Sequence, residues 1–141
     1  MFFPISDDAK QAFVRAGSLA TGAGEKFPDS RRLLASLLAV GTHRASLILS
    51  RLGCDLAQVA TETDTLWGVG EPPGLAGGEC LAAAFRESQT YGDQHVDTDH
   101  LLLSLWTKAD DPAARFLEQH GISLVQVRQE KERLDRETRC G

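Results

Sequence analysis

The chain has 141 residues, of which 42% are hydrophobic and 25% charged, and 20 acidic against 15 basic side chains give it a formal charge of −5. This length predicts one compact domain and is too short for an ATPase, or for a Rossmann enzyme with a separate substrate domain. The composition is typical of a soluble globular protein, and no apolar run approaches the ~18 residues of a membrane span. A nucleic-acid partner is disfavoured, because such a partner needs a basic face and this chain is acidic.

The cysteines and the start of the chain predict a cytoplasmic location. Cys54, Cys80 and Cys140 form no C-x-x-C pair and leave an odd thiol, as expected in a reducing compartment. The first residues turn acidic at Asp7 and lack the basic region of a secretory signal. We interpret Cys54 and Cys80 as small core residues.

Apolar residues recur at helical spacing along most of the chain, with capping and turn signals between the runs. The predicted helices run from Ser6 to about residue 20, from Asp29-Ser30 to about Leu38, from about Thr42 to Gly53, for a short stretch after Asp55, from about Glu79 to Tyr91, from Thr98 to Thr107, from Asp111-Pro112 to before Gly121, and from Ser123 through Glu137. No strand pattern of comparable quality is present. The predicted fold class is therefore all-α.

Glycine and proline are dense between the fourth and fifth predicted helices, over residues 62–78, and predict a connector there. Trp67 lies inside this segment. We expect Trp67 to anchor the connector to the body of the domain, and a free aromatic contact point is the alternative.

A shift of 68 positions aligns the two halves of the chain without a gap over about 30 residues. The matching pairs include Asp29 with Asp97, Ser30 with Thr98, Leu33-Leu34 with Leu101-Leu102, Ala45 with Ala113, Gly53 with Gly121, and Gln58-Val59 with Gln126-Val127. These matches predict a four-helix unit used twice, with each copy burying the apolar face of the other. The expected organisation is one domain over 1–141, with repeat 1 at about 5–61, the connector at about 62–78 and repeat 2 at about 79–137.

Sequence motifs of catalysis are absent from the chain. It contains no G-x-x-x-x-G-K-[ST] phosphate loop and no G-x-S-x-G elbow, and the four histidines show no H-E-x-x-H spacing. We therefore expect no catalytic residue, no cofactor and no metal, and a protein that is not an enzyme.

A family resemblance rests on the segment GDQHVDTDHLLLSL, residues 92–105. It resembles the G-H-x-x-V-G-T-E-H-L-L-L-G-L signature of the Clp N-terminal repeat, and residues 112–124 and the opening residues 5–10 are similar to other parts of that family. The resemblance implies the N-terminal domain of the Clp/Hsp100 AAA+ unfoldases, a docking module for adaptors and substrates of the Clp protease. Since no ATPase motif follows, we favour a free-standing relative, and a domain excised from a longer unfoldase is the alternative.

The resemblance also implies a set of candidate binding residues. In some family members the glutamate of Thr-Glu-His in each repeat helps to bind phosphoarginine, the degradation tag on substrates. The matching positions here are Arg31, which follows Ser30, and Asp99, which follows Thr98. Arg31 replaces the negative charge of that glutamate by a positive one, whereas Asp99 keeps the negative charge on a shorter side chain. Phosphoarginine is therefore expected at repeat 2 only. In the alternative interpretation, Ser30 and Thr98 are ordinary helix N-caps and Asp99 complements the helix dipole.

Two further residues belong to this candidate set. His100 follows Asp99 and is either a ligand-binding group or, as we favour, a packed and hydrogen-bonded structural histidine. Phe2 precedes the first helix. It either closes the core, which we favour, or borders a ligand groove as in family members with phenylalanine at this position.

We therefore predict a non-catalytic module that binds an adaptor, an unfoldase or a substrate protein of the Clp system. One alternative is a relative that sequesters small molecules in a groove around Phe2 and the start of the fifth helix. Another is a structural module whose doubled helices only dimerise.

Overall fold

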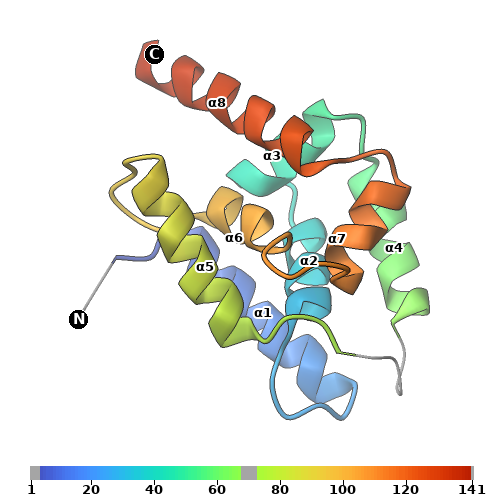
Figure 1. The fold of residues 1–141 in the computed structure, drawn as a ribbon. Coiled ribbons are helices and arrows are strands. Elements are labelled where there is room, and N and C mark those ends of the chain that lie inside the picture. The colour runs from blue at the N-terminus through green and yellow to red at the C-terminus, as the bar shows by residue number, and fades with distance from the viewer. Residues whose placement is uncertain (1–3, 68–72, 141) are drawn as a thin grey trace.

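The structure is a computed structural model that describes residues 4–67 and 73–140 (Figure 1). Within these ranges the chain forms α1 (Asp7–Gly22), α2 (Ser30–Ala39), α3 (Arg44–Arg51), α4 (Leu56–Leu66), α5 (Gly77–Thr90), α6 (Thr98–Ser104), α7 (Pro112–Gln119) and α8 (Leu124–Cys140). The described residues contain two isolated β-bridges and no strand. The all-α prediction is confirmed.

Several helix boundaries differ from the sequence prediction: α3 is two residues shorter at each end, α8 continues to Cys140, and three further differences have a structural cause or consequence. The fourth helix is longer than expected, because α4 continues to Leu66 inside the segment predicted as a connector. The fifth begins at Gly77, two residues earlier than predicted. The sixth ends at Ser104, since the N–H groups of Leu105 and Trp106 each bond to the carbonyl three residues back in a tighter turn.

The two halves of the fold correspond helix by helix at the same shift of 68 positions. Small buried residues of α1 have small buried counterparts in α5: Ala9 and Gly77, Ala12 and Cys80, Ala16 and Ala84, Ala20 and Ser88. Glycines with positive φ occupy equivalent turns, Gly24 (79°) and Gly92 (70°) after the first helix of each half, and Gly53 (91°) and Gly121 (80°) after the third. Positive φ is easily reached by glycine alone, so the halves share backbone turns as well as an apolar pattern.

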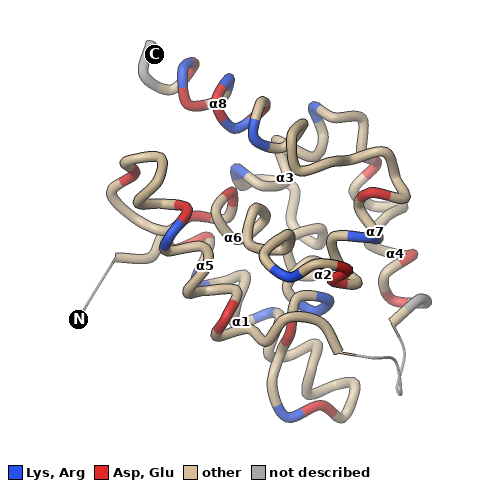
Figure 2. The backbone as a smooth tube through the Cα atoms, in the orientation of Figure 1, with Lys and Arg blue, Asp and Glu red and all other residues tan. Residues whose placement is uncertain are grey.

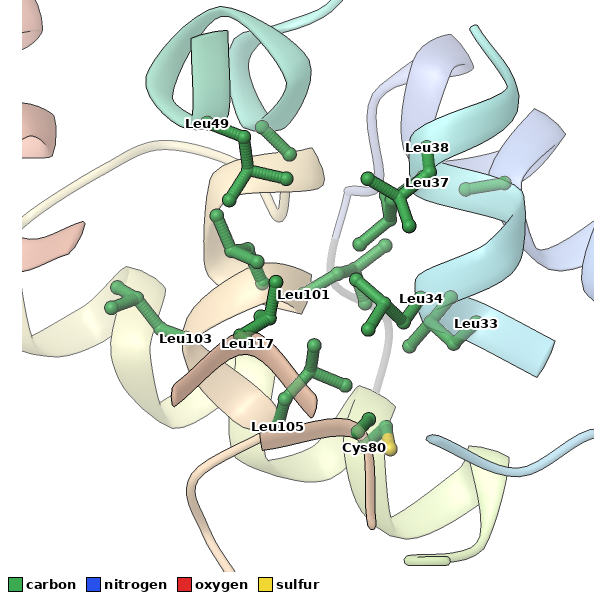
Figure 3. Packing of buried hydrophobic residues seen from close by; sticks show 14 of the residues in the cluster. Leu33, Leu34, Leu37, Leu38, Leu49, Cys80, Leu101, Leu103, Leu105 and Leu117 are labelled. Atoms are coloured by element: carbon green, nitrogen blue, oxygen red, sulfur yellow. The ribbon is translucent and has the colours of Figure 1, made fainter. Parts of the chain in front are cut away.

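The second helix of each half lies at the centre of the molecule. Nine residues of α2 are buried, and so is every residue of α6. Figure 3 shows leucines of α2, α3, α6 and α7 packed around one interior, with Leu34, Leu37 and Leu101 pointing toward one another. Each fully buried leucine contributes roughly 1.5–3 kcal/mol of transfer free energy, so this interior dominates the stability of the fold.

The segments that lead into the first helix of each half pair with the opposite half. The N–H of Ser6 donates to the carbonyl of Val96 (2.8 Å), just before α6, and the N–H of Val96 donates to the carbonyl of Pro4 (3.0 Å). In the same way, Ser30 N–H donates to the Leu75 carbonyl (2.7 Å) and Gly77 N–H to the Pro28 carbonyl (3.1 Å). The segment before the first helix of each half is therefore held by backbone hydrogen bonds to the other half.

The aromatic and cysteine side chains extend this packing. Trp67 is 5% exposed and its ring centroid lies 5.2 Å from that of Phe116 in α7, so its predicted anchoring role is confirmed. Trp106 is half-buried and donates through Nε1 to Glu118. Cys80 is fully buried, and burial raises the pKa of its thiol to about 12, whereas Cys54 is only half-buried.

No single helix of the described chain has the length and apolar character needed to cross a membrane. Only α2 and α3 taken together, bent by 81°, meet those limits.

Candidate functional site

The candidate residues Ser30, Arg31, Thr98, Asp99 and His100 lie at the starts of α2 and α6, and all five are buried. The interpretation of Ser30 and Thr98 as N-caps is wrong. Asp29 and Asp97 are the N-caps, because their extended backbone lets each carboxylate accept N–H groups of the first turn. Ser30 and Thr98 are instead the first helical residues.

The hydroxyls of Ser30 and Thr98 link the two repeats. Ser30 Oγ donates to Oδ1 of Asp111 (2.9 Å), the N-cap of α7. Thr98 Oγ1 accepts from the N–H of Ala45 (3.0 Å) in the first turn of α3. Since each hydroxyl is used inside the fold, neither is available to a ligand in this structure.

At repeat 1, Arg31 is paired with acids of its own repeat. It is 2% exposed; its Nε donates to Asp29 (2.8 Å) and its Nη2 to Glu25 (2.8 Å). Glu25 also accepts two hydrogen bonds from Arg32, and this pairing lowers the pKa of the Glu25 carboxyl. The guanidinium at this position therefore closes an internal ion-pair cluster.

At repeat 2, Asp99 lies at the centre of a buried charge network. Its Oδ2 accepts from Nε of Arg44 (2.9 Å) and from Nζ of Lys131 (2.9 Å), and the carboxylate is 1% exposed. Burial alone would raise the pKa of Asp99, but the neighbouring positive charges of Lys131 and Arg44 lower it. The carboxylate is therefore ionised and fully partnered.

Lys131 and Arg44 extend that network across α8 and α3. The fully buried Lys131 ammonium also contacts Asp93 (3.0 Å) and Asp135 (3.1 Å) and lies 4.5 Å from the centre of the Tyr91 ring. Arg44 donates to Asp135 as well. This network holds α8 against the rest of the molecule. Figure 2 shows that acidic and basic residues alternate along α8.

His100 is a structural histidine in this geometry, as the sequence favoured. Its Nδ1 accepts from the N–H of Asp97 (2.8 Å), which leaves the proton on Nε2 for Asp93 (2.6 Å). The equivalent positions in repeat 1 are Arg32 and Glu25, which form the same base-to-acid pair. In both repeats, therefore, a basic side chain at the start of the second helix pairs with an acidic side chain from the preceding turn.

An open cavity of about 270 Å³ lies beside Asp99. It is lined by Arg44, Asp93, Gln94, His95, Asp97, Asp99, His100, Asp135 and Thr138. The carboxylates of Asp93, Asp99 and Asp135 are held by the internal ion pairs described above, and that of Asp97 caps α6. Among the described residues, no group of three or more histidine, cysteine or acidic side chains is arranged to hold a metal ion.

A second cavity, of about 400 Å³, is almost wholly apolar and lies at the start of α5, where only the small-molecule alternative predicted a groove. Its lining consists of Phe13 of α1, Phe27 and Pro28 before α2, Ala76, and Gly77, Gly78 and Leu81 of α5. Phe27 is 79% exposed, the highest value among the large apolar side chains of the described chain. The feature of the sequence that could have indicated this cavity is Phe27, an aromatic residue in the turn between α1 and α2. Phe2 lies outside the described residues.

A family comparison agrees with this architecture. The model of the Clp repeat (R) N-terminal domain matches residues 4–120 and, separately, residues 76–138. The chain belongs to the Clp N-terminal domain family. The second match begins at the entrance to α5, as expected of a duplicated unit.

Curated relatives of this Clp N-terminal domain are much longer proteins. The ClpA homolog of Guillardia theta, an ATP-binding subunit of the ATP-dependent Clp protease, is 27% identical over 95% of this chain but only 17% of its own length. The chaperone protein ClpB of Oceanobacillus iheyensis is 26% identical over 92% of this chain and 17% of its own. The chain thus spans about one-sixth of these relatives.

Solved structures show the same fold. The N-terminal domain of ClpD from Arabidopsis thaliana superposes with a TM-score of 0.70 at 18% identity and covers 96% of this chain and 97% of that one. The Hsp104 N-terminal domain from Candida albicans gives a TM-score of 0.68 at 18% identity, over 90% and 88%.

Proposed function

We propose that this Clp N-terminal domain is a non-catalytic, cytoplasmic protein-binding module of the Clp ATP-dependent protease system. It docks an adaptor, unfoldase or substrate protein through the apolar cavity of Phe13, Phe27, Pro28, Ala76, Gly77, Gly78 and Leu81. The observation that carries the proposal is this exposed apolar cavity in a chain of this family.

The two cavities differ in whether the side chains that line them are already paired inside the fold. The polar cavity beside Asp99 has its charges paired internally, so a ligand there must displace existing ion pairs. The apolar cavity has no such internal use. Phe27 lies 79% exposed, and covering its ring with a partner releases roughly 1.5–3 kcal/mol of apolar transfer free energy. An apolar segment of an unfolded or adaptor protein is therefore the better occupant.

Binding of a permanently unfolded protein tests this docking site. Fluorescently labelled, carboxymethylated α-lactalbumin is titrated with the domain and followed by anisotropy. We expect Phe27→Ser to weaken binding by roughly tenfold, because one exposed aromatic anchor is lost. Val125→Ser is the matched control, since Val125 is 63% exposed on α8 and does not line the cavity. Equal affinity of the wild type and Phe27→Ser would contradict the docking site.

The link to Clp proteolysis is tested in a reconstituted reaction. The domain is added to casein degradation by the Clp unfoldase and protease of the same organism. We expect the wild type to change the rate and Phe27→Ser to lose that effect. An unchanged rate at every nucleotide and domain concentration would contradict a role in this system.

Phosphoarginine binding at repeat 2 has one observation in its favour, the cavity of about 270 Å³ beside Asp99. Against it, Arg44 already places a guanidinium on the carboxylate that the ligand's guanidinium needs. We propose that repeat 2 takes phosphoarginine only by displacing Arg44. Titration of the free amino acid should then show tighter binding to Arg44→Ala than to the wild type, and equal binding would contradict this arrangement.

Sequestration of a small molecule is the second candidate function. It is favoured by the position of the apolar cavity at the start of α5 and by its volume of about 400 Å³, within the usual range of ligand pockets. A thermal-shift screen decides between the two, because stabilisation by apolar compounds without any peptide binding would favour sequestration. Light scattering that finds a stable dimer without partner binding would favour the purely structural alternative.

A further inference from the structure

His43, the N-cap of α3, is a buried histidine that can cap its helix only while its ring is neutral. It is 6% exposed, and its Nδ1 accepts a hydrogen bond from the N–H of Ser46 (3.2 Å), so the ring proton lies on Nε2. Within the described chain, Nε2 is itself buried and makes no hydrogen bond. A proton added at Nδ1 would therefore remove the acceptor on which the cap depends.

The groups that face His43 come from α1, α2 and the segment before α6. Asp8 and Arg15 belong to α1, the carbonyl of Leu37 belongs to α2, and Asp97 precedes α6. Burial, and to a smaller extent Arg15, lower the pKa of His43 below its ordinary value of 6.5. The two carboxylates and the Leu37 carbonyl act in the opposite direction without cancelling the effect of burial. The positive end of α3 also disfavours a charged ring at this position.

The turn of backbone that His43 caps also carries two contacts between the repeats. The N–H of Ala45 donates to Thr98 Oγ1 of α6 (3.0 Å). Arg44, the first residue of α3, donates through Nε to Oδ2 of Asp99 (2.9 Å). Because one helical turn holds all three contacts, loss of the His43 cap weakens the attachment of this turn to α6.

Arg44 is the part of this attachment that faces solvent. Its side chain is 24% exposed and lines the polar cavity of about 270 Å³, whereas the Asp99 side chain is 1% exposed. Lys131, the other cation on Asp99 Oδ2, is fully buried. Arg44 is therefore the partner of Asp99 that can move out towards the cavity.

We propose that His43 is a pH-sensitive switch of the polar cavity. Protonation of its ring breaks the cap of α3, loosens the contact of Ala45 with Thr98 and releases Arg44, which uncovers the Asp99 carboxylate. The open form takes up a proton with the ordinary histidine pKa of 6.5 and the closed form with a lower one, so acidification favours the open form. The switch does not depend on the proposed docking function, since none of these residues lines the apolar cavity.

Amide hydrogen exchange tests the loosening of α3. The exchange rates of Ala45 and Ser46 are measured from about pH 7.5 to about pH 5 and corrected for the intrinsic effect of pH. In the wild type, we expect the corrected rates to rise by up to about tenfold for each pH unit below 6.5. His43→Asn should abolish this rise, because asparagine caps a helix and does not titrate. His95→Asn is the matched control, since His95 is an exposed histidine of the polar cavity, and it should keep the wild-type response. Equal responses of the wild type and His43→Asn would overturn the proposal.

The Nε–H resonance of Arg44 tests the release of Asp99 and needs no variant. In the ¹⁵N-labelled wild type, we expect this resonance to move towards the position of free arginine as the pH falls. Its midpoint should coincide with the titration of the His43 ring, below pH 6.5. An Arg44 resonance that stays in place while His43 titrates, or that follows a different midpoint, would contradict the coupling. Titration of His43 at or above its ordinary pKa would overturn the switch itself.

Discussion

The hydroxyl of Ser30, the first residue of α2, donates a 2.9 Å hydrogen bond to Oδ1 of Asp111, the N-cap of α7 in the other repeat. The same fully buried carboxylate accepts from the N–H of Leu75 (2.7 Å) and from the N–H of Ala113 (3.0 Å). Asp111 therefore joins three segments: the start of α2, the entrance to α5 and the start of α7. The equivalent junction in repeat 2 is Thr98 with Ala45, next to the N-cap His43.

Removal of the Asp111 carboxylate should destabilise the domain far more than loss of an ordinary cap. Asp111→Ala leaves the Ser30 hydroxyl and two N–H groups without acceptors in a buried site, and each costs about 1–3 kcal/mol. Asp55→Ala is the control, since Asp55 caps only the exposed start of α4 and costs about 1 kcal/mol. Urea denaturation measures both. Similar losses for the two variants would show that Asp111 does not join the repeats.

Gly74 is required by close contact rather than by its backbone angles. A Cβ at this position would lie 1.9 Å from Ser30 Oγ and 3.0 Å from Asp111 Oδ1, so we expect Gly74→Ala to lose about 1–3 kcal/mol of stability. Gly78→Ala, where a Cβ meets nothing within 4 Å, should gain up to about 1 kcal/mol because alanine favours the helix. Thermal unfolding of the two variants should therefore shift in opposite directions. A stable Gly74→Ala would contradict the packing described for this junction.

The network around Asp99 predicts a dependence between two substitutions. Lys131→Met leaves the buried Asp99 carboxylate with Arg44 as its remaining strong partner, and we expect a loss of about 3–5 kcal/mol. The double variant Asp99→Asn with Lys131→Met removes the uncompensated charge and should be more stable than Lys131→Met alone. Arg133→Met, at an exposed position of the same helix, should change stability little. Additive losses in the double variant would contradict the coupling.

His120 predicts how stability changes with pH. Its Nδ1 faces the carbonyl of Phe116 (2.9 Å) and its Nε2 faces Glu62 of α4 (2.7 Å), so both nitrogens contact acceptors and the charged ring is favoured. These contacts raise the pKa of His120 above its ordinary value of 6.5. The stabilisation is complete below that ordinary value and is lost as the pH rises through the raised pKa. The free-energy difference between the wild type and His120→Gln should therefore shrink from pH 6 to pH 9, and a constant difference would contradict the ion pair.

The sequence predicted the architecture well because that architecture follows from a repeated apolar pattern. The pairs of equivalent leucines and the glycines at 53 and 121 mark helices and turns that local chemistry fixes. The connector was less predictable, because α4 continues to Leu66 where packing of Trp67 on Phe116 overrides the weak helical pattern.

The candidate site was predicted less completely, for two physical reasons. The resemblance located the helix starts at Arg31 and Asp99, but their partners Glu25, Arg44 and Lys131 come from other elements and only folding brings them together. The apolar cavity needs α1, the turn before α2 and the start of α5 in contact. The spacing of residues along the chain does not predict that these three segments come into contact.

The central claim is that the duplicated helices present one apolar docking cavity and use their buried charges internally. Amide chemical shifts of the ¹⁵N-labelled domain, recorded during titration with unlabelled carboxymethylated α-lactalbumin, test it most directly. We expect the largest shifts at Phe13, Phe27, Gly77, Gly78 and Leu81. Shifts centred on Arg31 and Asp99, with those five residues unperturbed, would contradict the account.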